Sequence, residues 1–96
     1  MRIKITTSAA QDFEELRQYL AGRSYIGLQS VLADIEQTIR SIPDNLLLGR
    51  ATPRDDVRER ITPKYRYQIP YYVRGDIVYI LRVYHPKRAP LDYDSL

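Results

Sequence analysis

The last third of the chain concentrates the residue types that could carry chemistry. Residues 57–88 hold six arginines and the only histidine, His85. Guanidinium groups present a planar fork that binds phosphate or carboxylate oxygens in pairs. An imidazole has a pKa near neutrality and can act as a general acid or base. This region could therefore bind an anionic partner or cleave a phosphodiester.

Three of the arginines fall on two neighbouring strand-like runs. Arg58 and Arg60 are two residues apart, so their side chains should share one face of a strand. If Arg66 projects from the same face, the three would form a cluster about the size of a phosphate-binding site. The alternative is that they are separate surface charges, or that they pair with nearby carboxylates.

His85 follows directly after a strand-like run and could move protons on an RNA 2′-hydroxyl. The second proton carrier would be Glu59, but its alternation with Val57 and Ile61 places it on the side expected to be buried. There it could instead pair with an arginine and fix the strand geometry. His85 is equally compatible with a hydrogen-bonding role at a strand end, so both interpretations remain open.

Tyrosine dominates the aromatic residues, with nine tyrosines against one phenylalanine. Tyr65, Tyr67 and Tyr71 follow the alternation expected to face the core. Tyr72 and Tyr84 are expected on the open face, where tyrosines among arginines can stack on bases. The sequence contains no cysteine, no cluster with metal-ligand spacing and no glycine-rich phosphate loop, so we expect neither a metal nor another cofactor.

The elements that must position these residues can be read from periodicity. Residues 2–6 alternate like a strand, and Thr7 or Ser8 is expected to cap a helix that ends at Gly22, with Asp12 facing outward. An apolar stripe predicts a second helix over residues 24–41, ended by Pro43. Strands are predicted over residues 57–61, 65–73 and 77–84, with a tight turn at residues 74–76. Pro70 then requires an edge position or a bulge.

These elements predict an α+β domain over residues 1–96. It has an N-terminal strand, an antiparallel helical hairpin and a three-stranded antiparallel meander packed on the hairpin. The other sheet face should be open and basic, because residues 49–96 carry the excess of positive charge. We expect the tail, residues 89–96, to be loosely held. No stretch suits a membrane span or a signal peptide, which favours a soluble, cytoplasmic protein without membrane contact.

Five short motifs, in order along the chain, resemble those of the RelE/ParE toxin superfamily. They are Ala10-x-Asp12-Phe13-x-x-Leu16-x-x-Tyr19-Leu20, Pro43 followed by Gly49-Arg50, Val57-Arg58-Glu59, Tyr67-x-Ile69-x-Tyr71, and Ile80-Leu81-Arg82-Val83-Tyr84-His85-x-x-Arg88. The resemblance implies the toxin of a type II toxin–antitoxin pair. A cognate antitoxin would wrap the toxin with its C-terminal segment, and operator DNA would be bound only through that antitoxin.

Two subgroups of this superfamily compete as models. ParE-type toxins are described as inhibitors of DNA gyrase, whereas RelE- and YoeB-type toxins cleave mRNA on the ribosome. The YoeB-type pattern is matched by Glu59, Arg66 and His85, but Pro86 stands where that group has an aromatic residue. The resemblance is therefore closer to ParE. A toxin fold that has lost most of its toxicity is a third reading.

The ParE-type reading implies that the protein acts by binding rather than by catalysis. The residues expected to contact the target share a positive or titratable side chain and lie between the first meander strand and the segment after the last one. They are Arg58, Arg60, Arg66, His85 and Arg88.

Overall fold

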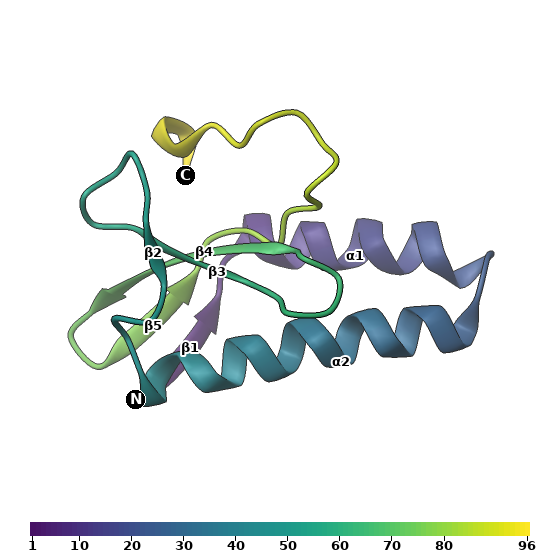
Figure 1. Cartoon of the computed structure of the whole chain (residues 1–96), viewed down its shortest axis with the longest axis horizontal. Coiled ribbons are helices and arrows are strands. Elements are labelled where there is room, and N and C mark those ends of the chain that lie inside the picture. Colours follow the sequence, from purple (N-terminus) through teal and green to yellow (C-terminus); the bar gives the residue numbers. More distant parts are fainter.

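The computed structural model describes residues 1–96 and consists of a helical hairpin packed against one face of a sheet (Figure 1). In chain order the elements are β1 (Arg2–Ile5), α1 (Thr7–Ala21), α2 (Tyr25–Ser41), the 3₁₀ turn η1 (Ile42–Asp44), β2 (Arg50–Ala51), β3 (Arg58–Ile61), β4 (Gln68–Arg74), β5 (Ile77–Ile80) and the 3₁₀ turn η2 (Tyr93–Ser95). The α+β architecture predicted from the sequence is confirmed.

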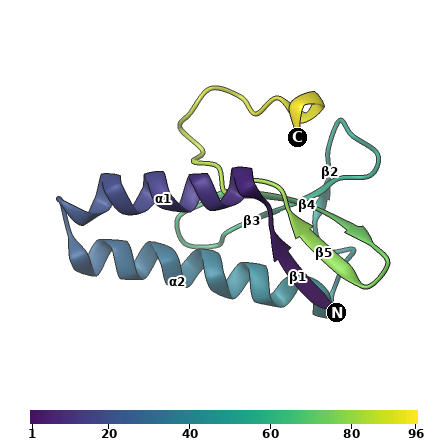
Figure 2. The same ribbon diagram turned by 180° about the vertical axis from the view of Figure 1, so that it is seen from behind.

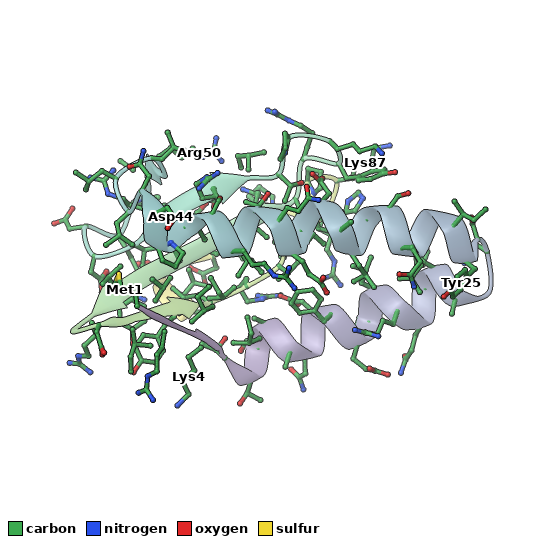
Figure 3. The ribbon with its side chains drawn as sticks, turned by 90° about the horizontal axis from the view of Figure 1, so that it is seen from below. Met1, Lys4, Tyr25, Asp44, Arg50 and Lys87 are labelled. Atoms are coloured by element: carbon green, nitrogen blue, oxygen red, sulfur yellow. The ribbon has the colours of Figure 1, made fainter.

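Both helices begin at a side-chain cap. The Thr6 hydroxyl accepts a hydrogen bond from Ala9 N at 3.3 Å, so the cap of α1 is Thr6 and not Thr7 or Ser8 as predicted. Ser24 caps α2 by accepting from Gly27 N at 2.9 Å. The two helices run antiparallel and extend well beyond the sheet, with Tyr25 at the far tip of the hairpin (Figure 3).

The sheet has five strands in the order β1-β5-β4-β3-β2. The predicted meander forms its centre, as β3–β4 and β4–β5 antiparallel pairs. One further strand lies at each edge of the meander. β1 pairs in parallel with β5, and the two-residue β2, in a segment predicted as a loop, pairs with β3. Figure 2 shows β1 alongside β5. The meander is therefore covered at both edges, which leaves β1 and β2 as the outer strands.

Pro70 lies in β4, between β3 and β5, so it is not at an edge. Tyr71 pairs with Ile80, and the same register would pair Gln68 with Val83. Gln68 instead pairs with Tyr84, so the segment after β5 contains one extra residue. This extra residue is a bulge, as the sequence allowed. Proline offers no N–H to the Leu81 carbonyl, and the Thr6 hydroxyl donates to that oxygen instead at 3.2 Å. The bulge ends β5 at Ile80, four residues before the predicted end.

The core lies between the hairpin and the sheet. The apolar stripe of α2 is buried as predicted, together with Tyr67, Ile69 and Tyr71 on the facing side of the sheet. Tyr65 is only partly buried against this core. Tyr72 points away from it, because it alternates with Tyr71 in β4.

Residues 89–96 are held in place, so the prediction of a loose tail is wrong. The Tyr84 hydroxyl donates to Ala89 O at 2.5 Å, and Arg54 Nη1 donates to Leu96 O at 2.9 Å. Between these points the Tyr93 hydroxyl donates to Glu59. Neither helix has the length and apolar character that crossing a membrane requires.

Candidate functional site

Arg58 and Arg60 share one face of β3, as predicted, but the face is the opposite of the expected one. Arg58 is paired across the strands with Tyr71, and Arg60 with Ile69. Directly opposed residues share a sheet face, and both partners belong to the core. The two half-buried arginines therefore flank Tyr71 on the helix side. Arg58 Nη1 donates to Gly49 O at 3.0 Å, whereas Arg60 Nη1 is buried without a hydrogen-bond partner.

Glu59 alternates with these arginines and points to the other face, where it is almost completely buried, at 1% exposure. Arg50 donates to its Oε1 through Nε at 2.9 Å and also through Nη2. Gln68 Nε2 donates to the same oxygen at 3.3 Å, and the Tyr93 hydroxyl donates to Oε2. The interpretation that Glu59 pairs with an arginine and fixes strand geometry is confirmed, since this pair joins β2 to β3.

The pairing of Glu59 shifts the protonation of its neighbours. The hydrogen bond to Glu59 raises the pKa of Arg50. Burial, and then the hydrogen bond and charge of Glu59, raise the pKa of Tyr93 to about 12. Both groups are therefore held in their protonated forms, in which each can donate to the carboxylate. This arrangement suits an anchor for the tail rather than a proton carrier in catalysis.

Arg66 is separated from the other two arginines. It lies in the turn between β3 and β4, is exposed, and has a left-handed backbone with φ of 65°. The turn is closed by hydrogen bonds from Arg66 N to Thr62 O at 3.1 Å and from Tyr67 N to Thr62 Oγ1 at 2.9 Å. The strand predicted from Tyr65 accordingly begins only at Gln68. The predicted arginine cluster on an open face is not formed.

His85 lines a groove of ≈470 Å³ between α1 and the segment that follows β5. Its ring packs edge-on against Tyr67, with 5.1 Å between centroids, and its Nδ1 accepts from Lys87 N at 3.0 Å. Burial, and then the charges of Lys87 and Arg88, lower the pKa of His85. The imidazole is thus biased toward its neutral form and anchored at a strand end, as one of the sequence readings allowed.

The same groove contains a residue that the sequence reading misplaced. Asp12 was expected to face outward, but it is buried and accepts from Arg82 Nε at 2.7 Å, Arg82 Nη2 at 3.0 Å and Val83 N at 2.9 Å. The i, i+4 spacing of Asp12 and Leu16 places both on the apolar side of α1 and could have indicated this. At the rim, Arg88 Nη2 lies 3.6 Å from Glu15 Oε2.

The motif residues of the loop before β2 have a structural explanation. A Cβ atom at Gly49 would lie 2.8 Å from Tyr71 Cε1, so only glycine fits against this ring. The Tyr71 hydroxyl donates to Leu46 O at 2.7 Å and fixes the same loop. The following Arg50 is the partner of Glu59. Three of the five sequence motifs therefore meet at this corner of the sheet.

The residues predicted to form one site thus lie in separate parts of the structure. Arg58 and Arg60 lie on the helix side of β3, Glu59 lies on the opposite face, and Arg66 is in a turn. His85 and Arg88 line the groove beside α1. No group of three or more His, Cys, Asp or Glu side chains lies together in a way that could hold a metal ion.

Comparison with known families decides between the superfamily branches. The model of the ParE toxin of the type II toxin–antitoxin system parDE matches residues 3–90. The chain belongs to the ParE toxin family. A solved structure described as the chromosomal ParDE toxin–antitoxin system from P. aeruginosa has a similar fold, with a TM-score of 0.76 and 23% identity, over 88% of this chain and 95% of that chain. A search of curated proteins gave no match.

The family match covers every helix and strand of this ParE-family chain except Arg2 of β1 and the η2 turn. It therefore includes the Asp12–Arg82 pair, the Gly49–Tyr71 contact and the Arg50–Glu59 pair. Tyr93 lies beyond the matched residues, so its contact with Glu59 is a feature of this chain that the family model does not describe.

Proposed function

We propose that this ParE-family chain is a cytoplasmic toxin that inhibits DNA gyrase by binding. The observation that carries the proposal is the family match over residues 3–90. The structure supports a binding mode because the groups needed for acid–base catalysis lie apart. Glu59 is occupied by three donors on one sheet face, and His85 lies in a groove on the other.

The proposed target-contacting surface combines the residues that remain available for an anionic partner. Arg58 and Arg60 flank Tyr71 and are only half-buried, so the accessible parts of their guanidinium groups can donate to an incoming carboxylate or phosphate. Arg66 is exposed in the adjoining turn, and His85 and Arg88 line the groove beside α1. A cognate antitoxin would neutralise the toxin by covering these residues with its C-terminal segment, and would recognise the operator sequence.

A supercoiling assay with purified toxin and gyrase tests this proposal. We expect the toxin to block the supercoiling of relaxed plasmid, and the antitoxin to restore it. Substituting Arg58 and Arg60 by glutamine should weaken the inhibition, whereas the same change at the exposed helix residues Arg17 and Arg40 should not. Undiminished supercoiling at a large molar excess of folded toxin would rule the proposal out.

The alternative from the sequence is a ribosome-dependent endoribonuclease using Glu59, Arg66 and His85. It requires these groups to reach one phosphodiester, with proton carriers within about 3 Å of the atoms they serve. Glu59 and His85 lie on opposite sides of the sheet, which argues against this mechanism. Primer extension on mRNA from toxin-expressing cells is the test: new 5′ ends within codons would favour cleavage, and their absence would favour gyrase.

A further inference from the structure

The sheet face opposite the helices carries a basic surface that differs from the one the sequence suggested. The register places Arg2, Ile77 and Arg74 in one row across β1, β5 and β4. It places Lys4, Tyr79 and Tyr72 in the next row. All six side chains share the face that alternates away from the core. We call these six residues the β1–β5–β4 surface.

The three cations of this surface are free of carboxylate partners. Arg2, Lys4 and Arg74 are exposed and take part in none of the four ion pairs of the structure. The three strands contain no acidic residue, and Asp76 in the β4–β5 turn is the only one in that hairpin. The tail covers the other part of this face, through its contacts with Glu59 and Arg54, and leaves β1 open. Lys4 projects from β1 away from α2, and Arg50 lies at the other edge of the sheet (Figure 3).

We propose that the β1–β5–β4 surface binds the phosphate backbone of duplex DNA, independently of the target of the toxin. Strand geometry spaces Arg2 and Lys4 about 6.6 Å apart and Arg2 and Arg74 about 10 Å apart at their Cα atoms. Cations at this spacing can each contact a different phosphate, and release of counterions drives such binding. The hydroxyls of Tyr72 and Tyr79 add donors beside them.

The tyrosines favour a duplex over a single strand. Tyr72 and Tyr79 stack on each other, with 4.9 Å between centroids and 11° between ring planes. Lys4 Nζ lies 6.0 Å from the centroid of Tyr79. Single-strand binders need free aromatic faces on which bases stack. Here the Tyr79 ring is already in contact with Tyr72 and Lys4. The surface can therefore contact phosphates more readily than it can stack on bases.

Fluorescence anisotropy with a labelled duplex of arbitrary sequence tests this proposal with the whole chain. Three phosphate contacts predict a slope of log K against log [salt] of about −2.7, or about 40-fold weaker binding at 200 mM than at 50 mM salt. The variant Arg2→Gln, Lys4→Gln, Arg74→Gln should lose most of this slope and bind more than about tenfold more weakly at low salt. A charge-matched control is Arg17→Gln, Arg40→Gln, Lys64→Gln, which should keep the wild-type slope.

Several results would overturn the proposal. Equal weakening by the control variant would show that binding follows net charge alone. Tighter binding to a single strand, or to a polyglutamate peptide, would assign the surface to another class of partner. The single change Arg74→Gln should make the slope less negative by about one. This variant keeps the test decisive if the triple variant does not fold. Gyrase inhibition is measured separately, so either proposal can fail without the other.

Discussion

Replacing Asp12 by alanine should destabilise the fold more than any other loss of a charged side chain on α1. Asp12 is 7% exposed and accepts three hydrogen bonds, two from Arg82 and one from Val83 N. The change leaves the Val83 N–H unsatisfied, at a cost of about 1–3 kcal/mol. It also leaves the Arg82 guanidinium without its partner.

The cost at Arg82 is smaller than for a fully buried charge. Removing one partner of a buried ion pair costs about 3–5 kcal/mol, but the Arg82 side chain is 25% exposed and can regain water. We therefore expect the free energy of unfolding to fall by about 2–4 kcal/mol in total. For a domain of this size the midpoint of thermal unfolding should fall by roughly 10–20 °C.

Urea unfolding monitored by circular dichroism measures this effect. The midpoint should shift at constant m-value, because the surface exposed on unfolding is unchanged. Glu36→Ala is the matched control, since this exposed acid on α2 has no ion-pair partner, and it should change stability by less than about 0.5 kcal/mol. In a double-mutant cycle, Asp12 and Arg82 should show a coupling of about 1–3 kcal/mol. A cost for Asp12→Ala no larger than that of the control would refute the reasoning.

Three further predictions follow from local contacts. Gly49→Ala should destabilise the fold by about 1–3 kcal/mol in urea unfolding, because the new methyl group meets the Tyr71 ring, whereas Gly22→Ala, with open space around it, should be close to neutral or stabilising. An NMR titration of His85, the only histidine, should give a pKa below 6.5, and its contribution to stability should be lost as pH falls through that pKa; a midpoint at or above 6.5 would contradict the burial described. In an absorbance titration Tyr93 should ionise near pH 12, and Tyr93→Phe should remove one tyrosine from the late part of the curve, to which Tyr67 and Tyr71 also contribute because burial raises their pKa. The stability that neutral Tyr93 contributes should be lost as pH rises from about 10, the unfolded pKa, through 12.

The helical hairpin and the three-stranded meander were predictable from the sequence because they depend on local patterns. Periodicity and capping residues located α1 and α2 to within a residue or two. The edge strands were not predictable in the same way. β1 pairs with β5 across more than seventy residues, and β2 is only two residues long. Neither leaves a periodic signal in its own segment.

The candidate site was predicted less well, for three physical reasons. Alternation correctly placed Arg58 and Arg60 on one face, but it does not say which face meets the helices. A buried ion pair reverses the usual link between charge and exposure, so Asp12, which was expected to face outward, is buried although it is acidic. The left-handed turn at Arg66 could not be predicted either, because that conformation is uncommon for residues other than glycine.

Trapping of the gyrase cleavage complex is the measurement that tests the central claim most directly. Purified toxin is titrated into gyrase and plasmid, the reaction is stopped with detergent, and linear DNA released by protease is quantified. A gyrase-binding toxin should raise the linear fraction with toxin concentration, and preincubation with the antitoxin should suppress the rise. A linear fraction that stays at the toxin-free level, with supercoiling unaffected in the same reactions, would contradict the account.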